Sequence, residues 1–132
     1  MVMIEQPEGM VEGMGNCGIV AIASALDIDY STVWDTVKRV TKKSNRWRGT
    51  MYTSEIRRTV KELGGKIKAV KKGGTLTKWI EWESAGGATY ILHTGGHYVA
   101  VRDQRVVDQH SASPVATHGC RKQRVKVAWK IN

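Results

Sequence analysis

Cysteine is scarce in this chain, and a long apolar run is missing. Two cysteines among 132 residues provide no disulfide framework of the kind that stabilises small secreted domains. No apolar stretch approaches the roughly 18 residues that a membrane span needs, and residues 1–6 have neither the basic nor the apolar region of a secretion signal. No repeat, low-complexity tract or clear linker divides the sequence. We therefore expect one domain over residues 1–132 without a membrane partner, in the cytoplasm of its own cell or, for a phage-encoded protein, of the host.

Acidic residues are outnumbered by basic ones. The chain has 12 Asp and Glu against 21 Lys and Arg, a formal net charge of +9 and a pI near 9.8. The cationic residues concentrate at 38–48, 57–72 and 121–130. Such a surface can attract an acidic macromolecule, and nucleic acid is one candidate because a tryptophan between two arginines can stack a base. The residues of this candidate surface are Lys42, Lys43, Arg46, Trp47 and Arg48. A solvated basic surface without a nucleic-acid role accounts for the charge equally well.

Cys17 stands directly before the apolar run at 19–26, in the sequence Gly-Asn-Cys-Gly. Apolar residues at 19, 22, 23 and 26 share one face of a 3.6-residue period, which predicts a buried helix with Cys17 at its N-terminal edge. Unpaired N–H groups and the positive end of the helix dipole favour an anion there, and they can lower a thiol pKa from about 8.5 to roughly 3.5–7.5. The position therefore predicts a nucleophilic thiolate.

His97 and Asp108 lie at the ends of two predicted strands. Residues 97–102 and 105–109 alternate apolar and polar side chains, and a polar turn near Asp103 and Gln104 separates them. An antiparallel hairpin turning there brings His97 and Asp108 together at its open end. An imidazole and the carboxylate that orients it require this proximity.

The order of Cys17, His97 and Asp108, with the Gly-His-Tyr-Val-Ala-Val strand and the following Val-Val-Asp, resembles papain-like cysteine peptidases. The closest resemblance is to the compact branch that includes the bacteriocin leader-processing peptidases. It implies Cys17 as the nucleophile, His97 as the general base and Asp108 as the group that orients it. The family also has an upstream glutamine as an oxyanion donor. Gln6 is the only glutamine before Cys17, 11 positions upstream, and Asn16 is a rival donor.

The other predicted elements fit the fold that this resemblance implies. A further helix is expected to begin at residue 30 and to end within 42–45, and others are expected at 53–63 and 76–83. Further strands are expected at 66–70, 88–93 and 124–131. The fold class is therefore α+β in a minimal papain-like form. An N-terminal helical half packs on a C-terminal antiparallel sheet, with the active cleft between them.

His93 competes with His97 for the role of base, because it ends the preceding predicted strand. The Thr-Gly-Gly sequence at 94–96 breaks the chain directly afterwards, and only His97 opens the strand that pairs toward Asp108. We therefore expect His93 and Gly96 to line the cleft as substrate contacts, together with Asn16.

A metal site is a different interpretation of the same residue types. Histidine and cysteine are zinc ligands, and the available residues are His93, His97, His110, His118 and Cys120. However, the His-x3-His pair spans a Gly-Gly turn, and no Cys-x2-Cys pair anchors the set. We expect no metal and no cofactor, and we place His118 and Cys120 on an exposed loop.

The sequence thus predicts a cysteine hydrolase that cleaves a peptide, isopeptide or related amide bond in a peptide or protein substrate, possibly an acidic one. Acyl transfer to an acceptor other than water uses the same residues and is the nearest alternative. The distant alternative is a catalytically idle basic adaptor that binds nucleic acid or an acidic protein.

Overall fold

The computed structural model describes residues 3–11, 15–84 and 86–132. Its helices are α1 (Cys17–Leu26), α2 (Tyr30–Val40), α3 (Thr53–Glu62) and α4 (Leu76–Glu83), with a 3-10 turn at Val115–Thr117. Its strands are β1 (Ile67–Ala69), β2 (Thr89–His93), β3 (Tyr98–Arg102), β4 (Arg105–Val107), β5 (Ala112–Pro114) and β6 (Val127–Ile131). These elements confirm most of the predicted ranges; β5 was not predicted.

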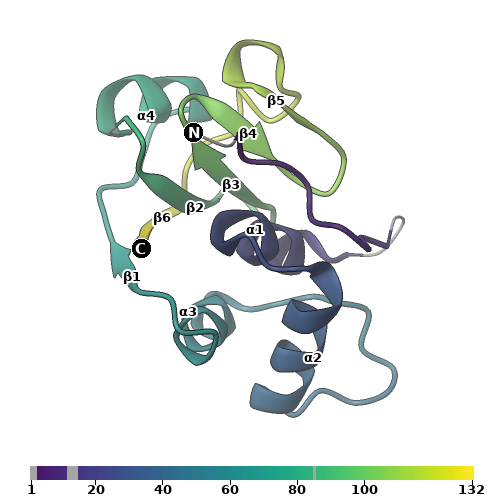
Figure 1. The fold of residues 1–132 in the computed structure, drawn as a ribbon. Coiled ribbons are helices and arrows are strands. Elements are labelled where there is room, and N and C mark those ends of the chain that lie inside the picture. Colours follow the sequence, from purple (N-terminus) through teal and green to yellow (C-terminus); the bar gives the residue numbers. More distant parts are fainter. Residues whose placement is uncertain (1–2, 12–14, 85) are drawn as a thin grey trace.

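The six strands form one antiparallel sheet in the order β1-β6-β2-β3-β4-β5. Helices α1, α2 and α3 lie on one face of this sheet, and α4 lies on the other (Figure 1). The α+β prediction of helices packed on an antiparallel sheet is therefore confirmed. Because both faces are covered, the central strands are apolar on both sides: Tyr98 and Ala100 of β3 pack toward α1, while Val99 and Val101 pack toward α4.

Helix α1 is buried around its whole circumference. Every residue from Gly18 to Ala25 is buried, because α2, α3 and the sheet surround the helix. The predicted buried helix is therefore confirmed, and its buried surface extends beyond the one apolar face that the period gives. Gly18 permits the close approach, since a Cβ there would lie 3.1 Å from both Ile56 Cδ1 and Met51 Sδ. The catalytic candidate Cys17 therefore begins an element that the core holds tightly.

The ends of the other helices follow from local chemistry. Asp29 caps α2, with its carboxylate accepting hydrogen bonds from the Thr32 N–H at 3.1 Å and the Ser31 hydroxyl at 2.6 Å. On α4, Trp79 is buried against β2, whereas Trp82 is 68% exposed and does not share that core face. No single helix in the described ranges is long and apolar enough to cross a membrane. Helices α1 and α2 meet that criterion only as a pair bent by 118°.

Candidate active site

The cleft beside Cys17 is small and is bordered by segments distant in sequence. Its volume is about 220 Å³. The lining residues are Gly15, Cys17, Thr50, Met51, Gly96, His97, Tyr98 and Gln109. Cys17 is the first residue of α1, so its side chain lies at the end of the helix where the free N–H groups are.

A tight hairpin positions His97 and Asp108. Strands β3 and β4 pair in the register Arg102 to Arg105, and the turn residues Asp103 and Gln104 have φ values of 51° and 64°, the left-handed geometry of a two-residue hairpin. At the open end, His97 Nε2 lies 3.0 Å from Asp108 Oδ2. The predicted hairpin and its turn position are confirmed.

Hydrogen bonds hold the Asp108 carboxylate in a fixed orientation. Its Oδ1 accepts from the backbone N–H groups of His110 and Ser111, each at 2.8 Å, while Oδ2 faces His97. Burial alone would raise the pKa of Asp108, but its interactions with the His118 and His97 side chains and with these two backbone N–H groups outweigh burial and hold its pKa well below the ordinary value. The group facing His97 is therefore a carboxylate.

The charges at Cys17 and His97 favour an ion pair. The hydrogen bond to Asp108 is the largest cause that raises the pKa of His97 to about 11, with contributions from Cys120 and Cys17. Burial alone would raise the pKa of the Cys17 thiol. Hydrogen bonds from His97 and from the Tyr98 backbone outweigh burial and lower that pKa below its ordinary value. A thiolate beside an imidazolium is the nucleophilic state of a cysteine.

Behind Asp108 lies a second cysteine and histidine pair. Cys120 and His118 are 6% and 1% exposed, so the predicted exposed loop at these positions is wrong. The Cys120 thiol donates to Asp108 Oδ2 at 3.2 Å, and its backbone N–H donates to His118 Nδ1 at 3.0 Å. The other ring nitrogen of His118, Nε2, lies 3.1 Å from Ser111 Oγ.

Three of these residues have ligand atoms close enough for a metal ion. His97, Asp108 and Cys120 each place one such atom within 4.8 Å of the other two, and no other such group occurs among the described residues. Their donor types suit zinc. The same atoms are hydrogen-bonded to one another, so an ion there would displace the contact between His97 and its carboxylate.

His93 is placed away from this centre. Its Nε2 accepts a hydrogen bond from the Gly96 N–H at 3.1 Å, and its ring packs on Tyr98 with 4.7 Å between centroids. Burial and the nearby charge of His97 lower its pKa. Of the three residues expected to line the cleft, Gly96 does so, whereas His93 and Asn16 do not.

The two residues expected to supply an oxyanion donor are engaged elsewhere. Gln6 Nε2 donates to the Asp108 carbonyl oxygen at 2.9 Å, and Gln6 lines a different cavity. Asn16 is buried, and its Nδ2 donates to the Val11 carbonyl oxygen and to Tyr30 Oη, both at 2.8 Å. Both amide protons of Asn16 are thus in use. The segment between Gln6 and Cys17 lies partly outside the described residues.

Gln109 was missed by sequence reasoning, although it directly follows Asp108. Its side chain is the one amide among the described residues that line the Cys17 cleft. Gln109 Nε2 lies 3.3 Å from His110 Nε2, which leaves a second amide proton for another acceptor. Its Oε1 is buried and has no partner in the described parts of the chain.

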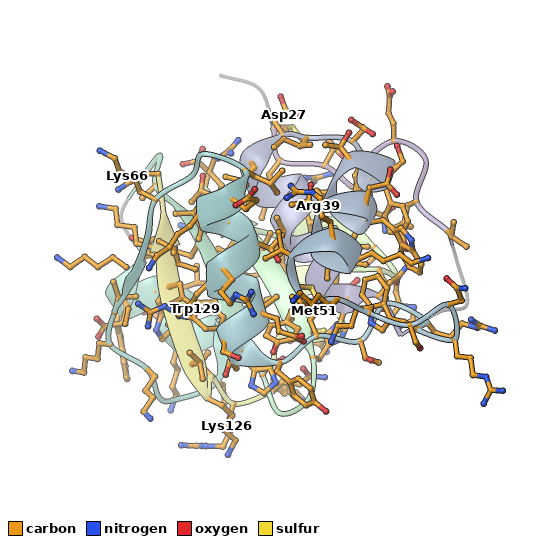
Figure 2. The ribbon with its side chains drawn as sticks, turned by 90° about the horizontal axis from the view of Figure 1, so that it is seen from below. Asp27, Arg39, Met51, Lys66, Lys126 and Trp129 are labelled. Carbon is orange, nitrogen blue, oxygen red and sulfur yellow. The ribbon has the colours of Figure 1, made fainter. Side chains whose placement is uncertain are left out.

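The candidate nucleic-acid surface is only partly free. Lys43 forms an ion pair with Glu55 at 2.6 Å, and the Trp47 ring packs on Trp34 with 4.6 Å between centroids. These two residues therefore make contacts within the protein. The role of Trp47 in stacking a base stays a prediction. The other three residues, Lys42, Arg46 and Arg48, are exposed. Cations also extend into solvent elsewhere, as at Lys66 and Lys126 (Figure 2).

Comparisons with known proteins were made with both the sequence and the fold. No protein-family model and no curated protein matches the sequence. The peptidase domain of Streptococcus ComA, a bifunctional ABC transporter involved in a quorum sensing pathway, is 14% identical with a TM-score of 0.60, over 98% of each chain. A double glycine motif protease from an AMS/PCAT transporter, solved in complex with the leader peptide, is 14% identical with a TM-score of 0.58, over 97% of this chain and 91% of the other. The chain shares the fold of these peptidase domains, as its resemblance to leader-processing peptidases predicted.

Proposed function

We propose that this chain is a cysteine peptidase, with Cys17, His97 and Asp108 as its reacting residues. The observation that carries the proposal is the 3.0 Å contact between His97 and Asp108, with His97 and Cys17 lining one cleft. The lowered pKa of Cys17 and the raised pKa of His97 agree with it. The shared fold with two peptidase domains adds independent support.

In the proposed reaction, the Cys17 thiolate attacks the carbonyl carbon of the substrate and forms a tetrahedral oxyanion. The C–N bond then breaks, and the His97 imidazolium gives its proton to the leaving amine. A water molecule next gives a proton to His97 and attacks the thioester, which releases the acid and restores the thiolate. Asp108 holds the imidazole with Nε2 toward itself, so that Nδ1 serves Cys17.

The oxyanion needs two donors. The backbone N–H of Cys17 is one, because the first residues of a helix have no acceptor within it. For the other we propose the Gln109 amide, since it lines the cleft with Cys17 and retains an amide proton. Gln6 and Asn16 make the bonds already described.

The proposed substrate is a peptide with small residues at the cleavage site. At about 220 Å³, the cleft is smaller than the roughly 300–1,000 Å³ of ordinary ligand pockets. Gly15 and Gly96 border it, and a Cβ on Gly96 would meet nothing within 4 Å. The neighbour described as a double glycine motif protease with a bound leader peptide suggests a glycine pair as the first sequence to test.

A peptide aldehyde or chloromethyl ketone ending in Gly-Gly tests this proposal. We expect one adduct by intact mass, mapped to Cys17, with no adduct in Cys17→Ala. A peptide library containing Gly-Gly sequences should be cleaved by the wild-type chain and not by Cys17→Ala. Release of the free acid, even with added amine, distinguishes hydrolysis from acyl transfer. Cleavage by a folded Cys17→Ala variant would refute the proposal.

A further inference from the structure

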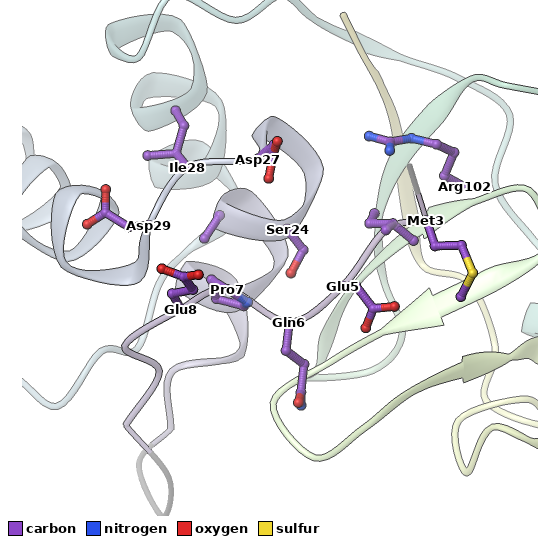
Figure 3. A pocket seen from close by; sticks show the side chains of 12 residues that line it. Met3, Glu5, Gln6, Pro7, Glu8, Ser24, Asp27, Ile28, Asp29 and Arg102 are labelled. Atoms are coloured by element: carbon purple, nitrogen blue, oxygen red, sulfur yellow. The ribbon is translucent and has the colours of Figure 1, made fainter. Parts of the chain in front are cut away.

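A second cavity, of about 370 Å³, lies apart from the Cys17 cleft and shares no lining residue with it. Its walls are the N-terminal segment 3–8, the end of α1, the connection to α2, and Arg102 of β3 (Figure 3). Four of the chain's 12 acidic residues line it: Glu5, Glu8, Asp27 and Asp29. This concentration of carboxylates is unexpected in a protein with a net charge of +9.

Two of these carboxylates, those of Glu8 and Asp27, have no partner within the described parts of the chain, whereas the other two do. Glu5 pairs with Arg105 at 2.9 Å, and Asp29 caps α2. No hydrogen bond or ion pair of the Glu8 and Asp27 side chains occurs among the described residues. The C-terminal end of α1, which Asp27 caps, adds partial negative charge to the same wall.

The one cation in the lining is already partly engaged. The Nε of Arg102 donates to Thr89 Oγ1 at 2.7 Å, on the neighbouring strand. The cavity therefore retains an excess of negative charge, which favours a cationic occupant.

Ser24 supplies an independent indication of a ligand. Its side chain lines the cavity, the residue is 5% exposed, and its hydroxyl has no hydrogen-bond partner among the described residues. Figure 3 shows this hydroxyl pointing away from α1, toward the segment that carries Glu5 and Gln6. A buried hydroxyl without a partner costs free energy, and a donor in the cavity would remove that cost.

The geometry distinguishes an organic cation from a metal ion. The acidic side chains of this cavity do not form a compact ligand group, since the one such group in the described residues is at His97, Asp108 and Cys120. Charges spread around the cavity suit several separated ammonium groups. Met3, Pro7 and Ile28 provide apolar wall between them, against which methylene groups can pack. The volume lies within the range of small-molecule sites.

We propose that this cavity binds an aliphatic amine with two or more ammonium groups, held by Glu8 and Asp27 and hydrogen-bonded to the Ser24 hydroxyl. Each ammonium pairs with a carboxylate through charge-assisted hydrogen bonds. The chain between the ammonium groups covers the apolar wall. This binding does not depend on the peptidase proposal, because the cavity and the Cys17 cleft are separate.

Calorimetric titration of the full chain with spermidine at low salt tests the proposal. We expect binding with a dissociation constant below about 1 mM, weaker for 1,4-diaminobutane and weakest for 1-aminobutane. The Glu8→Gln/Asp27→Asn double variant should lose about tenfold or more in affinity. Asn at position 27 tolerates the observed φ of 55°, so this variant is expected to fold. Glu81→Gln, an exposed acid on α4, is the matched control and should bind like the wild type.

Ser24→Ala provides a second measurement. The hydroxyl has no partner, so its removal should leave the melting temperature unchanged or slightly raised, while spermidine affinity falls about threefold or more. The proposal is overturned by undetectable spermidine binding, by equal affinity for the monoamine, or by equal loss in Glu81→Gln and the double variant. Displacement of spermidine by micromolar Ca²⁺ would also overturn it, in favour of a metal site.

Discussion

The Asp108 carboxylate lies between two cysteine and histidine pairs that differ chiefly in exposure. His97 and Cys17 line an open cleft, whereas His118 and Cys120 are buried on the other side. Both pairs contain the residue types of a thiol nucleophile and its base. The comparison indicates that a substrate can reach only the pair of Cys17 and His97. The buried pair helps to hold the shared carboxylate in place.

The largest expected difference is in thiol reactivity. His97→Ala should slow alkylation of Cys17 by iodoacetamide at pH 6 by about 100-fold or more, because it removes the group that stabilises the thiolate. His118→Ala should leave the rate within about tenfold, because His118 acts through the carboxylate. Asp108→Asn should fall between them, since an amide holds the imidazole less well. Peptide mapping after brief labelling measures each rate. An equal loss in both histidine variants would remove the distinction between the two sides.

The pH dependence of labelling sharpens the same comparison. Thiolate forms as pH rises through the lowered pKa of Cys17, and the imidazolium partner persists until pH rises through about 11 at His97. The alkylation rate should therefore reach a plateau below the ordinary titration range of a thiol. In His97→Ala the rise should move back to about pH 8.5. Cys120 should remain unlabelled across this range in the folded protein. Alkylation rates measured from pH 4 to 9 test this prediction. The same pH curve for the wild type and for His97→Ala would contradict it.

For stability we expect the opposite order: a substitution in the buried pair should cost more free energy of unfolding than one in the pair at the cleft. His118→Ala should lower the free energy of unfolding by about 2–4 kcal/mol, because it leaves a buried cavity and removes bonds to Cys120 and Ser111. Cys17→Ala should change it by less than about 1 kcal/mol, because the thiol lies at the cleft surface. Urea denaturation followed by tryptophan fluorescence compares them. A larger loss in Cys17→Ala would reverse our assignment of a structural and a reactive pair.

A smaller effect on Cys17 labelling is expected from a substitution in the loop that leads to the cleft residues Thr50 and Met51. Gly49 has a φ of 106°, and a Cβ there would lie 2.9 Å from Asn16 Cβ. Gly49→Ala should therefore cost about 2–3 kcal/mol and slow Cys17 labelling. Gly64→Ala is the matched control, because its φ of 85° is also positive but nothing lies within 4 Å of its Cβ. It should cost about 1–2 kcal/mol and leave labelling unchanged. Equal effects on labelling would mean that the close approach at Gly49 does not shape the cleft.

Local sequence patterns were enough to predict the pair of Cys17 and His97 at the cleft. Helix α1 follows from an apolar run with a helical period, and the contact of His97 with Asp108 follows from alternation and a two-residue turn. These inferences need only neighbouring residues and strand geometry. They do not reveal that α1 is buried on all sides, which depends on how α2 and α3 pack.

The buried pair behind Asp108 could not be predicted from the sequence, because its burial depends on tertiary packing. His118 and Cys120 lie in a segment without apolar periodicity, and their burial results from packing beside α4 and the sheet. Strand β5 has three residues and contains Pro114, so its sequence carries little strand signal. Gln109 follows Asp108 directly, yet only the turn at Asp108 places this residue in the lining of the cleft.

The two outer strands of the sheet have a consequence for the protein at high concentration. A free strand edge offers unpaired backbone groups to another chain, which promotes ordered aggregation. Here each edge is a three-residue strand: β5 ends at Pro114, which has no N–H to donate, and β1 carries the exposed cation Lys68. Such edges are poor templates for strand addition. Concentrated samples should therefore resist fibril formation, even though the central strands are among the most apolar segments of the chain.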